Sequence, residues 1–172
     1  MHPLRSFLFA PGNHPRKVEK VFQVGADVVI LDLEDAVAIT EKPATRATIV
    51  DALKKKHRGL GYVRINSLDT EFAWGDFAGV VGAWVDGIVL PKVETADQLQ
   101  TADWVLAQLE RGNGMEIGSI DLLPIIETGL GLHNIEAITM AGTRIKRVSF
   151  GAGDFTRDMN LVWTGPEQEL AY

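Results

Sequence analysis

The sequence contains no cysteine, which excludes disulfide bonds, thiolate metal sites and a cysteine nucleophile, and which is typical of a reducing compartment. Its apolar runs are all much shorter than the roughly twenty residues that a membrane-spanning helix needs. Basic residues are also few: 17 Lys and Arg against 23 Asp and Glu give a net charge of -6, which argues against a protein that binds nucleic acid. We therefore predict a soluble, cytoplasmic protein that binds neither membranes nor nucleic acid and acts on a small molecule.

The 172 residues are 46% hydrophobic and 23% charged, which is ordinary for one globular domain. Neither a low-complexity tract nor an obvious linker interrupts the chain, so we treat residues 1–172 as a single domain. Short apolar segments alternate with segments of helical periodicity. The apolar segments predict strands at residues 6–10, 27–33, 61–66, 86–90, 121–126 and 148–150. The segments between them predict helices that begin near Pro15 and at residues 43–57, 72–84, 94–109 and 130–140, with another beginning after residue 166.

This alternation predicts a parallel sheet with right-handed crossovers. Such a sheet is either open and doubly wound or closed into a TIM (β/α)8 barrel. Every predicted strand has its polar residues at its carboxyl end, as in barrel active sites, whereas an open sheet concentrates them at one switch point. We therefore predict an α/β fold of the TIM-barrel type. Because a complete barrel takes roughly 250 residues, we expect a partial barrel, truncated after about six strand-helix units.

Two acidic residues follow predicted strands. Glu127 ends the apolar run that starts at Asp121, and Asp154 follows residues 148–150 across a Gly-Ala-Gly segment. Carboxylate oxygens in such places suit a hard cation such as magnesium. The alternative is that each acid stabilises the first turn of the helix after it. The recurrence of polar residues at the other strand ends favours the metal site.

Two basic residues also lie at strand ends. Arg64 either binds a substrate carboxylate in a planar, two-pronged way or pairs with Glu34 or Asp35 to hold the barrel together. Lys92 follows the fourth predicted strand, where a barrel aldolase would keep a Schiff-base nucleophile. The two strand-end acids argue against that mechanism, because it has no need of them.

The chain carries a series of spaced motifs. In order, they are Arg5-Ser6-Phe7-Leu8-Phe9-Ala10-Pro11-Gly12, Arg16 with Lys20, Asp32-Leu33-Glu34-Asp35-Ala36-Val37, Arg64-Ile65-Asn66, Leu90-Pro91-Lys92, Ile126-Glu127-Thr128 and Gly151-Ala152-Gly153-Asp154-Phe155. Together they resemble the motifs of the citrate lyase beta-subunit family, which includes the malyl-CoA and related acyl-CoA lyases. The resemblance covers essentially the whole chain and is specific for the family rather than for one substrate. It implies a magnesium-dependent barrel that makes or breaks a carbon-carbon bond between an acyl thioester and a 2-oxoacid.

The resemblance also implies roles for the residues at the strand ends. Glu127 and Asp154 match the magnesium ligands, which places Glu127 beside the substrate as well. Arg64 matches the arginine that holds the carboxylate and carbonyl of the oxoacid. Glu34 and Asp35 match acids that line the pocket floor and reach metal-bound water or the substrate arginine.

Arg16 and Lys20 match basic residues near the coenzyme A phosphates. They are four positions apart and therefore share a helix face, where the alternative is a solvated surface pair. The family's remaining strands, and an acidic residue of its C-terminal segment, have no counterpart in this chain. The resemblance therefore leaves the proton-transfer group unassigned.

These observations predict a magnesium-dependent carbon-carbon lyase of the citryl-CoA or malyl-CoA type. Its partners would be a 2-oxoacid and an acyl thioester of coenzyme A or of an acyl-carrier protein. One alternative is a metal-dependent pyruvate aldolase on the same barrel; another is a non-catalytic subunit. Because an unclosed barrel has open sheet edges that invite pairing with another chain, we expect a homo-oligomer.

Overall fold

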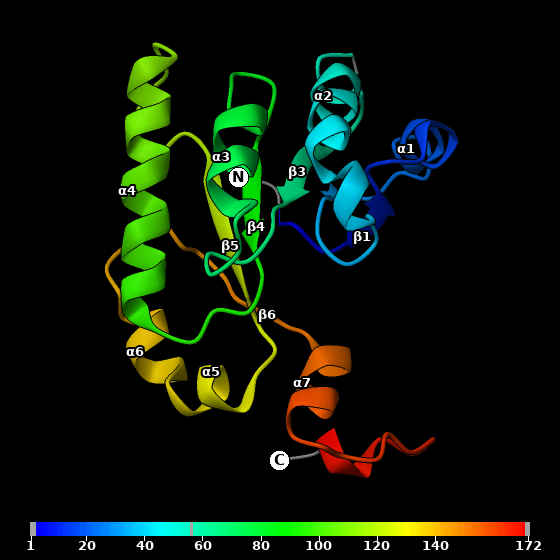
Figure 1. The fold of residues 1–172 in the computed structure, drawn as a ribbon, viewed down its shortest axis with the longest axis vertical. Helices are drawn as coiled ribbons and strands as arrows, with labels where there is room; N and C mark the ends of the chain where they lie inside the picture. The colour runs from blue at the N-terminus through cyan, green and yellow to red at the C-terminus, as the bar shows by residue number, and fades with distance from the viewer. Residues whose placement is uncertain (1–2, 56, 171–172) are drawn as a thin grey trace.

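The computed structural model describes residues 3–55 and 57–170 and contains a curled sheet of six parallel strands (Figure 1). The strands pair in sequence order, each with the next. They are β1 (Phe7–Pro11), β2 (Val28–Asp32), β3 (Leu60–Arg64), β4 (Gly87–Leu90), β5 (Asp121–Ile126) and β6 (Ser149–Phe150). This arrangement matches the prediction of six strand-helix units, and it brings all six carboxyl ends to the same edge of the sheet.

A helix follows every strand, although the helices predicted over residues 43–57 and 72–84 each end four residues earlier. Residues 152–158 form a helix for which no range was predicted, and in the described residues a short 3-10 helix stands where a helix was predicted after residue 166. The helices are α1 (Pro15–Val21), α2 (Lys42–Leu53), α3 (Ala73–Val80), α4 (Ala96–Gly112), α5 (Gly129–His133), α6 (Ile135–Thr139) and α7 (Ala152–Asp158), with short 3-10 helices η1 (Ile39–Glu41) and η2 (Gln168–Leu170). Pro15 occupies the first turn of α1, where a missing N–H costs nothing. The longest helix, α4, starts with a capping box, in which the Thr95 and Gln98 side chains each accept a hydrogen bond from the other's backbone N–H.

The strands are apolar along their length because both faces of the sheet are buried. One face packs against the helices through residues such as Val29, Leu31 and Ile88. The other is the concave inner face, where Ile30, Tyr62 and other side chains form a second cluster. Polar residues follow these apolar side chains at the carboxyl ends of the strands.

The segment predicted as one helix over residues 130–140 forms two, α5 and α6. Asn134 lies at the junction and its side-chain amide donates a hydrogen bond to the Glu94 carbonyl at 2.8 Å. This tertiary contact ends α5 where helical periodicity alone would continue it. Helices α5, α6 and α7 all lie at the carboxyl ends of the strands (Figure 1).

Within the part of the chain that the structure describes, every helix is too short or too polar to cross a membrane. Asp121, which opens the strand that leads to Glu127, lies at the opposite, amino end of the sheet. There it accepts a hydrogen bond from the Tyr62 hydroxyl at 2.6 Å and pairs with Arg147. Asp121 therefore ties β3 to the segment before β6 and takes no part in the cluster at the carboxyl ends.

Candidate active site

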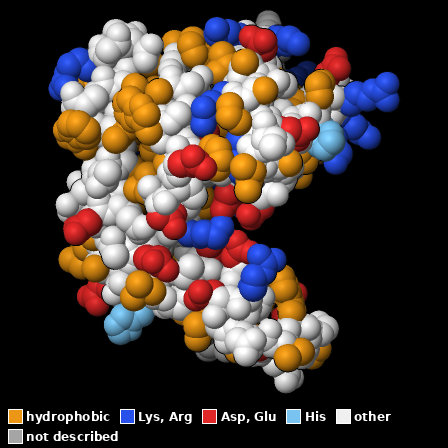
Figure 2. Space-filling view, viewed as in Figure 1, with side chains coloured by type: hydrophobic (Ala, Val, Ile, Leu, Met, Phe, Trp, Pro, Cys, Tyr) orange, Lys and Arg blue, Asp and Glu red, His pale blue; other side chains and the backbone are white. Residues whose placement is uncertain are grey.

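The predicted site residues meet at the carboxyl ends of the strands. Glu34 and Asp35 follow β2, Arg64 ends β3, and Glu127 follows β5. Asp154 lies in the first turn of α7, just after β6. Acidic and basic side chains gather beside a hollow on this side of the molecule (Figure 2). The structure thus brings together residues that are up to 120 positions apart in the sequence (154 minus 34).

Arg64 is held by a two-pronged contact with Asp32. Its Nε and Nη2 atoms donate to the two Asp32 carboxylate oxygens, each at 2.7 Å, and its Nη1 atom lies 3.0 Å from Glu34 Oε2. Asp32 is fixed in turn by the backbone N–H groups of Glu34 and Ala36, at 2.9 and 3.1 Å. Burial opposes the charge of Arg64, but its hydrogen bonds to Asp32 and the charges of the nearby acids more than offset burial and raise the pKa of Arg64. Arg64 is therefore a permanent, rigidly oriented cation.

Lys92 places its ammonium group among the acids. The Nζ atom donates to Glu34 Oε1 and lies 3.4 Å from Asp154 Oδ2 and 4.0 Å from Asp35 Oδ1. Burial would lower the pKa of Lys92, but the Glu34 contact and the neighbouring acids raise it instead. A Schiff-base nucleophile needs a neutral amine and hence a lowered pKa. The structure therefore argues against that alternative.

Glu127 is almost fully buried, with 3% of its surface exposed. Its Oε1 atom accepts a hydrogen bond from the Lys92 backbone N–H at 2.8 Å. Burial, with the charges of Glu34 and Asp154, raises the pKa of Glu127 to about 7 even though that hydrogen bond opposes the shift. Gly151 makes room for this carboxylate, because a Cβ atom there would lie 2.5 Å from Glu127 Oε2.

Glu127 and Asp154 together fit the coordination habits of magnesium. Both residues are carboxylates. Gly151 leaves space beside the buried Glu127, and the Lys92 ammonium group lies against Asp154. Among residues 3–55 and 57–170, no three acidic or histidine side chains are grouped so that they could hold a metal alone. Magnesium does not require three, since it keeps several waters and is bound by one or two carboxylates together with its substrate.

The comparison with known proteins decides the family. The sequence model of the HpcH/HpaI aldolase/citrate lyase family matches residues 5–172. The chain belongs to this family. The citrate lyase subunit beta of Leuconostoc mesenteroides subsp. cremoris is 36% identical to this chain over 170 residues, which cover 98% of this chain and 56% of that protein. An L-malyl-CoA/beta-methylmalyl-CoA lyase from Cereibacter sphaeroides is 37% identical over 168 residues, which cover 95% and 52%.

Solved structures agree. A citrate lyase beta subunit from M. tuberculosis, complexed with oxaloacetate and magnesium, superposes with a TM-score of 0.73 at 28% identity. The superposition covers 94% of this chain and 65% of that one. The resemblance read from the motifs and the partial TIM-type barrel are therefore both confirmed. The chain spans about half the length of the curated relatives that it matches.

Two predicted residues of this family member lie apart from the acid cluster. Arg16 and Lys20 are both exposed on α1. Within the described residues, neither makes a hydrogen bond or ion pair with the residues at the strand ends. Asp35 also departs from expectation, because 56% of its side chain is exposed. It lies at the rim of the cluster, whereas Glu34 is buried.

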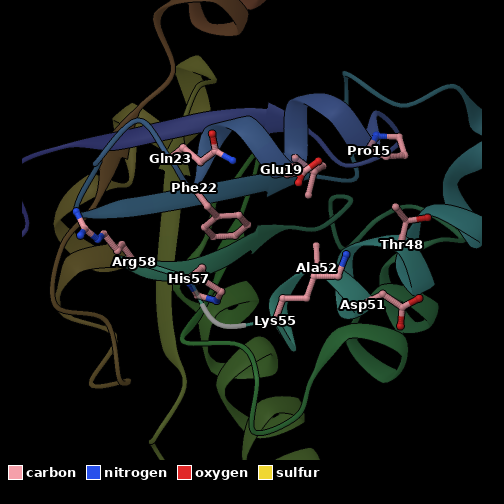
Figure 3. A pocket seen from close by; sticks show the side chains of 11 residues that line it. Pro15, Glu19, Phe22, Gln23, Thr48, Asp51, Ala52, Lys55, His57 and Arg58 are labelled. Carbon is pink, nitrogen blue, oxygen red and sulfur yellow. The ribbon is translucent and has the colours of Figure 1, made fainter.

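A groove of about 880 Å³ runs between α1 and α2 (Figure 3). Phe22 and His57 stack at its centre with their ring centroids 4.4 Å apart. None of the predicted site residues lines it, and its two acids, Glu19 and Asp51, are both exposed. The groove is therefore separate from the candidate metal site.

Sequence reasoning missed a buried polar network behind the site. The Lys42 ammonium group donates to the Leu33 and Glu34 carbonyls at 2.8 and 2.6 Å, and to Asn66 Oδ1 at 2.7 Å. The Asn66 amide donates in turn to Asp76 Oδ2 at 2.6 Å. The network ties the loop after β2 to the loop after β3, and so sets the relative positions of Glu34 and Arg64. Arg46, four positions after Lys42 and therefore on the same helix face, donates to Asp76 as well. No local sequence pattern indicates these contacts, because their partners lie on other elements.

We expect Lys42→Met to destabilise the fold by about 1–3 kcal/mol, because it leaves the buried Asn66 Oδ1 atom without its donor and removes the nearer donor from the Leu33 and Glu34 carbonyls. Urea unfolding followed by circular dichroism measures this loss. The matched control is Lys55→Met, which removes an exposed lysine just beyond the same helix and should change the unfolding free energy little. Equal stabilities of the two variants would contradict the role given to the network.

Proposed function

We propose that the protein is a magnesium-dependent carbon-carbon lyase that cleaves or forms a short 3-hydroxyacyl thioester of the citryl-CoA or malyl-CoA type. One observation carries this proposal: two carboxylates, Glu127 and Asp154, share the carboxyl edge of a barrel-type sheet with an anchored arginine, Arg64. The names of its relatives support the same chemistry, since they include citrate lyase and malyl-CoA lyase.

Cleavage of such a thioester starts with loss of the proton of the 3-hydroxyl group. The resulting alkoxide becomes the carbonyl of the 2-oxoacid, and the electron pair of the broken carbon-carbon bond passes to the enolate of the acyl thioester. Glu127 and Asp154 would hold the magnesium ion, which when bound supplies Lewis acidity and a template for the oxoacid oxygens. Arg64 would grip the oxoacid carboxylate. Of the five N–H donors of the Arg64 guanidinium, two are used in the hydrogen bonds to Asp32. The guanidinium is therefore oriented in advance and still has donors for a substrate.

Glu34 and Lys92 would set the charge around the oxoacid. Glu34 lies between Arg64 and Lys92, so its carboxylate can orient both cations. Arg16 and Lys20, exposed on one face of α1, would neutralise the phosphates of coenzyme A. These assignments follow from the resemblance together with the positions of the residues.

Thioester cleavage with and without metal tests the function. Citryl-CoA and L-malyl-CoA are offered to the protein in EDTA and then with excess magnesium, and release of the 2-oxoacid is followed. We expect activity that needs the metal and that returns when magnesium is restored. The same substrates on an acyl-carrier protein identify the thioester. Magnesium-dependent cleavage of a pyruvate aldol, with no thioester turnover, would instead establish the aldolase alternative.

A further inference from the structure

The Lys92 ammonium group contacts carboxylate oxygens at the candidate metal site, including one of Asp154, a proposed metal ligand. Its Nζ atom is 3.4 Å from Asp154 Oδ2 and hydrogen-bonds to Glu34. Arg64 is nearby but shares its charge with Asp32. Two cations lie 3.4 Å from Asp154, Lys92 at Oδ2 and Arg157 at Oδ1. The Arg157 side chain is 84% exposed and the Lys92 side chain 37% exposed, so water screens the charge of Lys92 less and Lys92 is the stronger competitor for Asp154.

The backbone of Lys92 contributes a second, independent observation. Its φ angle is 51°, in the left-handed region that residues other than glycine adopt at some cost. In this conformation its backbone N–H donates to Glu127 Oε1 at 2.8 Å. One residue thus contacts both proposed metal ligands, Glu127 through its main chain and Asp154 through its side chain.

The two contacts have opposite consequences for a divalent cation. The N–H group orients the Glu127 carboxylate and leaves its Oε2 atom beside Gly151. The ammonium group, in contrast, is a positive charge within ion-pair distance of Asp154. A cation bound by Asp154 would be repelled by an ammonium group at this distance, because the two side chains are only 37% and 19% exposed and water screens their charges incompletely.

We propose that Lys92 is a built-in competitor of the metal: its ammonium group neutralises the acid cluster in the metal-free protein and leaves Asp154 when a divalent cation binds. The inference rests on the proposed function, because it takes Glu127 and Asp154 as the metal ligands. Lys92 is in these terms a positioning residue. Its ammonium group keeps the hydrogen bond to Glu34 after the exchange, because Glu34 is not one of the proposed metal ligands.

Calorimetry with magnesium chloride alone, without oxoacid, tests the competition. We expect Lys92→Met to bind magnesium about tenfold more tightly than the wild type, because the competing charge is gone and the backbone N–H to Glu127 is kept. Lys92→Arg retains a cation and should stay close to the wild-type affinity. Lys55→Met is the control for the same change of net charge at an exposed position, and it should leave the affinity unchanged.

An unchanged or weaker magnesium affinity in a folded Lys92→Met variant overturns the inference while the proposed function stands. Should that variant not fold, crystals of the wild type grown with and without magnesium answer the same question. The inference requires the Nζ to Asp154 separation to lengthen from 3.4 Å to beyond ion-pair range in the magnesium form. Magnesium on Glu127 and Asp154 with Lys92 still against Asp154 refutes it. Failure of the wild type and every variant to bind magnesium, both alone and with a 2-oxoacid present, removes the inference and the proposed metal site together.

Discussion

Glu127→Gln should lower the affinity for magnesium together with a 2-oxoacid by at least about 100-fold, a loss near 3 kcal/mol, and should abolish thioester cleavage. Because Glu127 and Asp154 are the two carboxylates proposed as metal ligands, a neutral amide at either position removes half of the negative charge that the protein places on the metal. The fold should survive, because burial already opposes ionisation of Glu127 and the amide oxygen can still accept the Lys92 N–H. Asp154→Asn should behave in the same way.

Calorimetry of magnesium binding at a fixed oxoacid concentration measures the effect, and thermal unfolding shows whether the variant is folded. Glu136→Gln makes the same chemical change at an exposed site on α6 and should bind magnesium as the wild type does. Full magnesium-oxoacid affinity in Asp154→Asn would remove Asp154 from the site and leave it as a residue of the first turn of α7.

Arg64→Lys should lower kcat/KM by at least about 30-fold, which is about 2 kcal/mol, although it conserves the charge. The guanidinium makes a planar, two-pronged contact with Asp32 at 2.7 Å on each side, and an ammonium group cannot reproduce that contact while also holding a carboxylate. The loss should appear as weaker oxoacid binding, because the cation itself is misplaced.

Steady-state kinetics with varied oxoacid in the synthetic direction, or binding of the oxoacid with magnesium, measures the Arg64 effect. Arg111→Lys is the control, since Arg111 is exposed on α4 and, among residues 3–55 and 57–170, its side chain hydrogen-bonds to Gln108 alone. Wild-type oxoacid affinity in Arg64→Lys would reduce Arg64 to a structural partner of Asp32.

The order of strands and the position of the acids could be predicted because both follow from local patterns. An apolar run such as residues 27–33 predicts a strand that is buried on both faces of a parallel sheet. The carboxyl ends of neighbouring parallel strands necessarily lie at the same edge of that sheet. Glu127 and Arg64 could therefore be placed together before any distance was known. The family resemblance added the roles but not the contacts.

The remaining features depend on tertiary contacts that no local pattern carries. Nothing near Lys92 in the sequence indicates a left-handed backbone, since lysine has no preference for it. The sequence around Lys42 predicts an exposed lysine at the start of a helix. In the fold its ammonium group is instead buried and donates to the Leu33 and Glu34 carbonyls. The break at Asn134 likewise depends on the carbonyl of Glu94, forty positions earlier.

Diffraction from crystals soaked with manganese, in place of magnesium, and a 2-oxoacid tests the central claim most directly, because manganese is located by its anomalous signal. The proposed site predicts one metal ion ligated by Glu127 and Asp154, with the oxoacid completing its coordination and its carboxylate on Arg64. A metal ion bound elsewhere, or an oxoacid that contacts neither the metal nor Arg64, would contradict it.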